Sequence, residues 1–275
     1  DDMKHKQKIA EDVSLIVTTY NRPVFMELVL KSIIRQSLLP AEVVVADDGS
    51  GEETRKLIAR YAKIFPVPLI HSWIPDEGFR LSKSRNIAIA CSKGEYIISI
   101  DGDIVLARDF VRDHVQARRP GYFISGGRAR LSKAATLIRC KTLNDHFSLM
   151  SRGLKRPLTM IRLPWLHSVL KGPEGVRKIR GCNMSFWRRD LIAANGFEEK
   201  IEGWGCEDTE LVVRLYNNGV KRLNIPGLAS CVHLYHPGAK DSKVTRVRNA
   251  RIEDESAATK KKRADQGIDQ YLPEK

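Results

Sequence analysis

Short apolar runs alternate with amphipathic segments through the first hundred residues. The apolar runs are rich in β-branched residues and end at turn residues, so they predict strands. Strands are expected at residues 13–19, 42–47, 68–73 (an edge strand) and 95–100. Helices are expected at residues 23–36, 52–64 and 80–91. Strands that alternate with helices predict an α/β fold with a mostly parallel sheet covered on both faces.

The pattern is less regular in the second half of the chain. A strand and two helices are expected at residues 181–187, 188–194 and 207–218. Strand signals then continue to His236. Residues 131–178 interleave basic and bulky apolar side chains, which suits either a membrane-interface segment or an insertion packed on the core with a solvated basic face. From Pro237 onward the charged composition predicts a tail that is either disordered or a loosely attached helix.

The composition is that of a globular protein. Of the 275 residues, 42% are hydrophobic and 29% charged, enough for a substantial core. No apolar run is long enough to predict a transmembrane helix, and the first residues lack the apolar segment of a signal peptide. The five cysteines show no paired spacing, which predicts neither a zinc site nor a disulfide framework and favours a reducing, cytoplasmic compartment.

The net charge of +14 predicts an anionic partner without identifying it. Nucleic acid, an acidic membrane surface and a phosphorylated substrate all fit a basic chain. The choice among them depends on the residues that carry chemistry.

Two carboxylates, Asp101 and Asp103, follow the strand expected at 95–100. At the end of a buried strand they repel each other and are costly to desolvate. A divalent cation relieves both costs, because Mg²⁺ and Mn²⁺ take hard oxygen ligands and can hold phosphate groups beside them. Gly102, between the two acids, leaves room for a backbone or ligand to approach. Asp and Gly are also ordinary turn residues, so a solvated turn is the alternative.

Polar residues follow three of the expected strands, at Thr18–Asn21, Asp47–Asp48 and Asp101–Asp103. In a parallel sheet, ligands bind beyond the carboxyl ends of the strands. We therefore expect one cleft at this edge of the sheet to gather all three groups.

Residues 203–210, Gly-Trp-Gly-Cys-Glu-Asp-Thr-Glu, form a second candidate site. Glu207 and Asp208 open an expected helix, where the helix dipole alone favours acidic residues. The glycines before them predict an open loop, and Trp204 offers a flat apolar face to a ligand. A carboxylate beside such a face is well placed to take a proton from a bound hydroxyl group.

Basic residues surround the start of the helix expected at 80–91, namely Arg80, Lys83 and Arg85. A helix N-terminus with basic side chains suits a diphosphate. The same pattern also fits a solvated helix face, so these residues alone do not decide between the two.

Two histidines, His233 and His236, end the strand-like segment that starts at Cys231. Imidazole is a common metal ligand. In a regular strand the two side chains would point to opposite faces, so a strand end or a bulge is needed to bring either one to a metal.

These motifs together resemble glycosyltransferase family 2 of GT-A fold. The resemblance covers about Val13 to Gly238 and rests on the runs at residues 13–23, 44–50, 80–86 and 100–103. Residues 203–208 are similar to the acceptor and base motif of the β-1,4-galactosyltransferases and bacterial chondroitin polymerases. The acidic run is shorter here than in the animal galactosyltransferases, so the resemblance does not extend to the acceptor.

The resemblance implies a Rossmann-like, mostly parallel sheet flanked by helices, with a small antiparallel sheet region near the C-terminus. It divides the chain into a GT-A domain, at 13–238, and two flanking segments. The implied parts are an N-terminal extension (1–12), a nucleotide-sugar-binding half (13–105), an acceptor half (106–238) with a basic insertion (131–178), and a charged C-terminal tail (239–275).

The family also implies a nucleotide-sugar donor, most often a UDP-sugar, and a divalent metal. The residues implied at the donor site are Thr18, Tyr20, Arg22, Asp47, Asp48, Arg80, Lys83, Arg85, Asp101, Gly102 and Trp204. Asp103 is implied to bind Mn²⁺ or Mg²⁺ directly, with His236 favoured over His233 to complete the coordination. Asp208 matches the catalytic base, and Glu207 lies beside it.

The sequence thus predicts an inverting, metal-dependent sugar transfer from a UDP-sugar to a glycan or glycolipid acceptor in bacterial polysaccharide or lipopolysaccharide synthesis. The basic charge favours an anionic acceptor and peripheral contact with an anionic membrane, on the inner face of the plasma membrane. A nucleotidyltransferase or another metal-dependent nucleotide-sugar enzyme is the alternative. A glycoside hydrolase also uses two carboxylates but needs no nucleotide. No nucleic-acid partner is expected, because the acids of the cleft would repel its phosphates.

Overall fold

The computed structural model describes residues 7–165, 175–176, 178–238 and 243–273. Parts of three segments discussed above lie outside the described residues. These are the start of the N-terminal extension, the end of the basic insertion, and both ends of the charged tail, at residues 1–6, 166–174, 177, 239–242 and 274–275.

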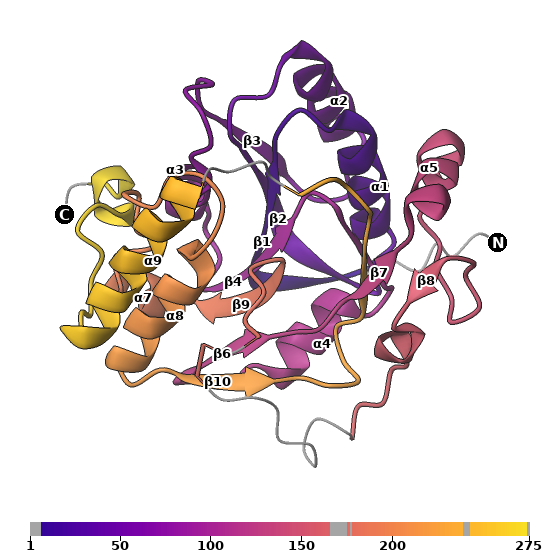
Figure 1. The fold of residues 1–275 in the computed structure, drawn as a ribbon. Coiled ribbons are helices and arrows are strands. Elements are labelled where there is room, and N and C mark those ends of the chain that lie inside the picture. Colours follow the sequence, from indigo (N-terminus) through magenta and orange to yellow (C-terminus); the bar gives the residue numbers. More distant parts are fainter. Residues whose placement is uncertain (1–6, 166–174, 177, 239–242, 274–275) are drawn as a thin grey trace.

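A seven-stranded sheet forms the centre of the molecule (Figure 1). Its order is β10-β6-β9-β4-β1-β2-β3. The strands are β1 (Lys8–Thr19), β2 (Leu38–Asp47), β3 (Leu69–Trp73), β4 (Tyr96–Asp101), β6 (Tyr122–Ser125), β9 (Asn183–Trp187) and β10 (Lys221–Asn224). Strand β9 runs antiparallel to β4 and β6, and the other pairs are parallel. The mostly parallel sheet, with β3 at its edge, is confirmed.

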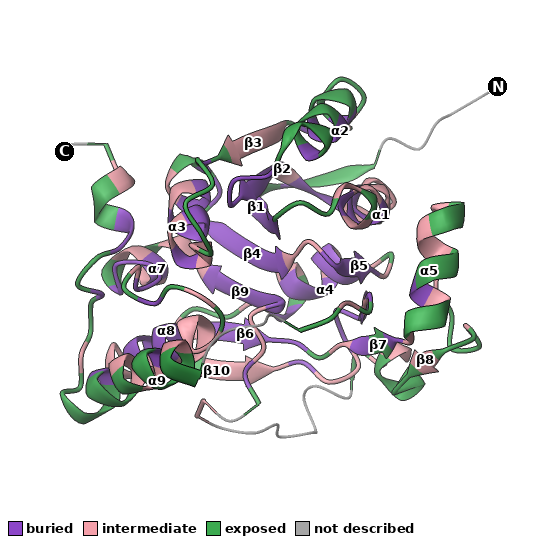
Figure 2. Cartoon of the chain, turned by 45° about the horizontal axis from the view of Figure 1, so that its top comes forward, coloured by how far each residue is buried: buried purple, intermediate pink, exposed green. Residues whose placement is uncertain are grey.

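Helices cover both faces of this sheet. They are α1 (Pro23–Ile34), α2 (Glu52–Ala62), α3 (Leu81–Cys91), α4 (Phe110–Ala117), α7 (Arg188–Ala193) and α8 (Glu207–Asn217). Alternate residues of a strand point to opposite faces. Leu15 and Val17 accordingly pack with α1, α2 and α4, whereas Ile16 packs with α3, α7 and α8. Figure 2 shows the inner strands buried between the two helical layers.

A second sheet, of order β5-β11-β7-β8, lies beside the first. It consists of β5 (Ile104–Leu106), β7 (Ala129–Leu131), β8 (Leu154–Lys155) and β11 (Cys231–His233). The expected small antiparallel region was placed near the C-terminus, but this sheet also takes strands from the middle of the chain, and its β11–β7 pair is parallel. Only Gly102 and Asp103 separate the end of β4 from the start of β5, so the chain passes directly from one sheet to the other at these two residues.

The basic insertion packs on the core with one side and exposes apolar side chains on the other. Its described part includes α5 (Lys133–Thr142) and the 3₁₀ helix η1 (Pro157–Met160). Leu131 and Leu154 join a small apolar cluster with β5 and β11, whereas Ile138, Met150 and Leu158 are exposed. Within the described ranges, no helix has both the length and the apolarity that crossing a bilayer requires.

Both ends of the chain are more ordered than the sequence predicted. Strand β1 begins at Lys8, inside the expected extension, because Lys8–Ala10 pair with Leu38–Pro40. The described part of the tail forms α9 (Lys243–Ala258) and the 3₁₀ helix η2 (Ile268–Tyr271). The prediction of a disordered or loosely attached tail is wrong there, since Ser256 Oγ donates to the buried Glu210 carboxylate at 2.8 Å and Ile268 is fully buried.

Candidate active site

The register of the central sheet brings three polar strand ends to one edge. Thr18 pairs with Asp101 on β4, and Thr19 pairs with Asp47 on β2. The Thr18 hydroxyl donates to Asp101 Oδ1 at 3.3 Å. The residues after β1, β2 and β4 therefore lie side by side, as the parallel-strand argument predicted.

Asp103, His233 and His236 form a compact group with the donor atoms of a metal site. One ligand atom from each lies within 4.8 Å of the others. Asp103 Oδ2 is 2.8 Å from His236 Nε2 and 3.6 Å from His233 Nε2. Strand β11 pairs its last residue, His233, with Ile104 and then ends, so strand alternation no longer separates the two histidines. Both therefore reach Asp103, rather than one of them alone.

The protonation of these side chains suits a cation. His236 Nδ1 is 2.7 Å from the Pro237 carbonyl, which can accept its proton and leave Nε2 for a metal. Burial lowers the pKa of His233 to about 4 despite the nearby Asp103 carboxylate, so this imidazole is neutral at physiological pH. Asp103 Oδ1 is buried without a hydrogen-bond partner in the described chain. One carboxylate and two imidazoles fit Mn²⁺ or Mg²⁺, and the nitrogen ligands favour Mn²⁺.

A buried arginine joins the two acidic motifs. Arg85 of α3 is 1% exposed, and its guanidinium lies 2.9 Å from Asp101 Oδ1 and 3.6 Å from Glu207 Oε1. Arg85, one of the implied donor-site residues, thus bridges the end of β4 to the start of α8. The carboxylates near residue 101 and those near residue 207 therefore lie close together, on either side of one guanidinium group.

The adjacent acids at the start of α8 have different surroundings. Asp208 accepts hydrogen bonds from the backbone N–H groups of Gly181, at 2.7 Å, and of Thr209, at 2.8 Å. Glu207 Oε2 is buried and has no hydrogen-bond partner in the part of the chain that the structure describes. Burial, and next the Asp208 charge, raise the pKa of Glu207 to about 7, although Arg85 opposes the shift. Glu207 is therefore partly protonated near neutral pH.

The loop before α8 is built from backbone conformations with positive φ. Gly203, Gly205 and Cys206 have φ values of 76°, 106° and 71°. Such values are uncommon outside glycine, so this loop turns sharply into the helix. Trp204, in this loop, is 52% exposed, and the Arg246 guanidinium lies 6.0 Å from the centroid of its ring.

A second group of polar atoms lies at the ends of β1 and β2. Asp48 Oδ2 accepts the Arg80 backbone N–H at 2.7 Å, whereas its buried Oδ1 has no partner among the described residues. Burial raises the pKa of Asp48 to about 6. The Tyr20 hydroxyl donates to Asp76 at 2.9 Å, and its ring is 45% exposed. An aromatic face and an unpartnered carboxylate oxygen suit a nucleobase.

The remaining donor-site candidates differ in their positions. Arg22 lies 3.7 Å from Asp103 Oδ2, beside the metal group. Asp47 is fully buried, and its oxygens are taken up by the Ser50 N–H at 2.8 Å and His71 Nε2 at 2.7 Å, so it holds the loop instead of facing the cleft. Lys83 is two residues from Arg85 on α3, and side chains at this spacing do not share a helix face.

Gly102 is required by a close backbone contact. A Cβ atom at this position would lie 2.2 Å from the carbonyl oxygen of Thr18. The turn from Asp101 to Asp103 is therefore packed against β1 with no space for a side chain. This confirms the close approach that the glycine predicted.

Comparison with known proteins identifies the family. Residues 14–154 match the description Glycosyl transferase family 2, and residues 167–237 match the N-terminal domain of galactosyltransferase. The chain belongs to glycosyltransferase family 2. The family expected from the sequence motifs is thus confirmed, and both halves of the candidate active site lie within matched segments.

Curated relatives of this family 2 chain include synthases and glucosyltransferases. It is 24% identical to a chondroitin synthase of Escherichia coli, over 88% of this chain and 37% of the relative. It is 25% identical to a hyaluronan synthase of Pasteurella multocida, over 83% of this chain and 25% of the relative. It is 25% identical to a validoxylamine A glucosyltransferase of Streptomyces hygroscopicus, over 76% of this chain and 48% of the relative. The chain thus spans between a quarter and a half of these relatives.

Solved structures confirm the GT-A fold. The S. aureus TarS fragment 1–349 in complex with UDP-GlcNAc superposes with a TM-score of 0.63 at 17% identity, over 94% of this chain and 69% of that one. The structure of GalNAc-T7 with UDP, GalNAc and Mn²⁺ superposes with a TM-score of 0.64 at 15% identity, over 88% of this chain and 47% of that one. At these identities the likeness shows the shared fold alone.

Sequence analysis did not identify three residues near the candidate active site, because none of them belongs to a recognisable motif. Gly181 supplies the N–H that holds Asp208, and Arg180 precedes it. The Arg128 guanidinium lies 2.8 Å from Cys182 Sγ and contributes positive charge near Asp101. A glycine pair before Arg128 is the only local signal, and glycine pairs are common in turns.

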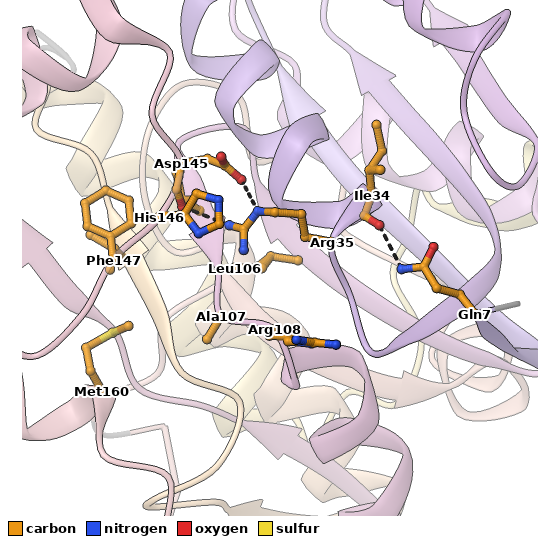
Figure 3. Close-up of a pocket in the computed structure, with 12 residues that line it drawn as sticks. Gln7, Ile34, Arg35, Leu106, Ala107, Arg108, Asp145, His146, Phe147 and Met160 are labelled. Carbon is orange, nitrogen blue, oxygen red and sulfur yellow. Dashed lines mark hydrogen bonds and ion pairs between the residues drawn. The ribbon is translucent and has the colours of Figure 1, made fainter. Parts of the chain in front are cut away.

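A separate cavity of about 610 Å³ lies away from these carboxylates, below the end of α1 (Figure 3). It is lined by Arg35, the segment 106–108, the segment 145–147 and Met160, among others. Arg35 donates to the Asp145 carboxylate and, at 2.9 Å, to its backbone oxygen. This Arg35–Asp145 pair contrasts with the buried atoms of Asp48, Asp103 and Glu207, which have no hydrogen-bond partner among the described residues. Unpartnered buried polar atoms indicate a ligand site, so the carboxylate cleft is the better candidate.

Proposed function

We propose that the chain transfers a sugar from a UDP-sugar to a hydroxyl group of a glycan or glycolipid, with inversion at the anomeric carbon. The contact of Arg85 with both Asp101 and Glu207 carries this proposal, because it unites a candidate metal site and a candidate base in one cleft. The names of the relatives, which include polysaccharide synthases, support a glycan acceptor. Fold neighbours bound to UDP or UDP-GlcNAc support the donor.

The donor is held between the strand ends and the metal group. The exposed ring of Tyr20 and the free Oδ1 of Asp48 recognise the base, and Thr18 and Asp101 lie where the ribose follows. Asp103, His233 and His236 would hold Mn²⁺ or Mg²⁺. When bound, such a cation supplies positive charge that stabilises the departing diphosphate. Arg22, beside Asp103, adds a further positive charge on the same side.

Asp208 acts as the general base. Its carboxylate is oriented by hydrogen bonds from the N–H groups of Gly181 and Thr209. The acceptor hydroxyl gives its proton to Asp208 as its oxygen forms a bond to the anomeric carbon. The bond to the diphosphate breaks on the opposite side, so the product has inverted configuration. Trp204 provides the surface on which a sugar ring rests.

Two variants separate donor binding from transfer. Asp208→Asn should reduce turnover by about 10²-fold or more, because the base is lost. It should keep the thermal stabilisation by UDP and Mn²⁺.

Asp103→Ala should lose the thermal stabilisation by UDP and Mn²⁺, as should the wild type in EDTA. Normal turnover of Asp208→Asn, or metal-independent UDP binding, would contradict the proposal, and release of pyrophosphate instead of UDP would identify a nucleotidyltransferase.

The acceptor is anionic and membrane-associated in this proposal. The support is the net charge of +14 together with the exposed apolar residues of the basic insertion. Such a chain would work at the cytoplasmic face of the plasma membrane, in the synthesis of lipopolysaccharide or another surface glycan. Co-sedimentation with vesicles containing phosphatidylglycerol should fall as salt increases, and equal retention on neutral vesicles would count against an electrostatic contact.

A further inference from the structure

Four arginines lie near one another, close to the metal group and the candidate base. We call them the arginine cluster: Arg128, Arg130, Arg156 and Arg180. Arg130 on β7 is the register partner of His233 on β11 and of Lys155 on β8, so it shares a face of the small sheet with the metal group. Arg180 directly precedes Gly181, whose N–H binds Asp208. The cluster therefore reaches from one half of the site to the other.

The cluster lacks the carboxylate partners that other arginines of the molecule have. Arg162 is paired with Asp113, and the buried Arg214 is paired with Glu210. Among the described residues, the side chains of Arg130, Arg156 and Arg180 make no hydrogen bond or ion pair. The buried Nε of Arg128 also has no partner there.

The arginines are close enough to repel one another. The pKa of Arg180 is lowered, first by burial and then by the guanidinium groups of Arg128, Arg156 and Arg130. Gathering like charges in a partly buried place is costly, and a bound anion relieves the cost. A cation at Asp103 adds positive charge to the same region and strengthens this preference.

We propose that the arginine cluster binds an anionic substituent, a carboxylate or a phosphate, of the acceptor sugar. This inference rests on the proposed function, since Asp208 marks the place of the acceptor hydroxyl. Guanidinium groups bind carboxylate and phosphate through paired, charge-assisted hydrogen bonds. An anion on the cluster would hold the acceptor beside Asp208 and would select charged over neutral acceptors.

Calorimetric titration of the protein saturated with UDP and Mn²⁺ tests the preference. The probes are an unsulfated chondroitin hexasaccharide, the same oligosaccharide after reduction of its carboxyl groups, and a glucosamine disaccharide with and without its phosphate. We expect at least one anionic probe to bind about tenfold more tightly than its neutral counterpart. The better of the two anions tells whether the substituent is a carboxylate or a phosphate.

Arginine variants assign the preference to the cluster. Arg180→Gln and Arg130→Gln should each remove most of the roughly tenfold preference, whereas Arg180→Lys should keep part of it. The control is Arg189→Gln, on α7 at the other side of Figure 1 from β7 and β8, which should change nothing. All variants should bind UDP with Mn²⁺ as the wild type does, which also shows that they fold.

Three results would overturn the inference. They are equal affinity for anionic and neutral probes, no binding of any probe, and cluster variants that weaken UDP binding in place of probe binding. The last would assign the arginines to the donor diphosphate. Failure of the wild type to bind UDP with Mn²⁺ would instead contradict the proposed function, so the two failures are distinguishable.

Discussion

Glu207 and Asp208 show how one residue along the chain changes the chemistry of a carboxylate. Asp208 is held in place by hydrogen bonds from two backbone N–H groups. Glu207 is buried next to that charge, and its pKa is raised to about 7. We infer that Asp208 is the base and that Glu207, through Arg85, positions the strand-end acids.

The raised pKa of Glu207 costs stability as the pH increases. The folded protein binds the proton of the Glu207 carboxyl group more tightly than the unfolded chain does. The free energy of unfolding therefore falls as the pH increases from 4.5 to about 7, by up to about 3 kcal/mol. Glu207→Gln does not titrate and should be stabilising relative to the wild type at pH 8, with a smaller difference at pH 4.5. Urea unfolding at both pH values measures this.

Glu53→Gln, at an exposed position of α2, is the control and should show no such pH dependence. A stability difference between Glu207→Gln and the wild type that is equal at both pH values would contradict the burial of this charge.

The contact of Gly102 with β1 gives a second prediction at this scale. Gly102→Ala places a Cβ against the Thr18 carbonyl and must displace Asp101 and Asp103. We expect UDP binding in Mn²⁺ to weaken by about tenfold or more, because small displacements of positioned groups are costly. Gly127→Ala is the matched control, since a Cβ there meets no atom within 4 Å. Unchanged UDP affinity of Gly102→Ala by calorimetry would show that the turn can adapt.

At the scale of elements, α9 fixes the loop that leads into α8. Asn249 is fully buried, and its amide donates to the backbone oxygens of Glu202 at 3.0 Å and Gly205 at 3.1 Å. The C-terminal helix therefore holds the loop that carries Trp204 and precedes the two catalytic-motif acids. The segment that its composition predicted to be a charged tail therefore supports the loop of the candidate active site.

Asn249→Ala should loosen this loop. The substitution removes both hydrogen bonds and leaves the Gly205 carbonyl without its donor, whereas the Glu202 carbonyl keeps the Arg248 guanidinium at 2.8 Å. An unsatisfied buried carbonyl costs about 1–3 kcal/mol of stability. Turnover should fall while UDP binding with Mn²⁺ remains, because the donor half is untouched. Arg251→Ala, at an exposed position of the same helix, should change neither quantity. If Asn249→Ala alters stability alone and leaves turnover unchanged, α9 has no part in positioning the loop.

Most elements could be predicted because each has a local cause. Pro23 begins α1 as a proline at the first helical turn does, and the β-branched run before Asp101 forms β4. The tail could not be foreseen, because α9 is anchored by a few polar residues, such as Asn249 and Ser256, that composition assigns to a surface. A single polar residue that is buried by a distant part of the chain leaves no periodic pattern in the sequence, so sequence analysis does not detect it.

At the scale of the molecule, the site depends on how two sheets meet. Strand β4 leaves the central sheet at Asp101, and β5 enters the second sheet at Ile104, opposite His233. The acids were predictable as a motif. That both histidines reach Asp103, and that four arginines lie beside them, depends on the register among β5, β11 and β7, which connects residues more than a hundred positions apart.

A crystal structure of the protein with UDP and Mn²⁺ tests the central claim most directly. That claim is that the metal group and the base face one donor pocket. We predict an anomalous peak for manganese in contact with Asp103 and at least one of His233 and His236. The distal phosphate should face the space in front of Asp208. Manganese bound elsewhere, or UDP bound in the cavity of Figure 3 with the carboxylate cleft unchanged, would contradict the account.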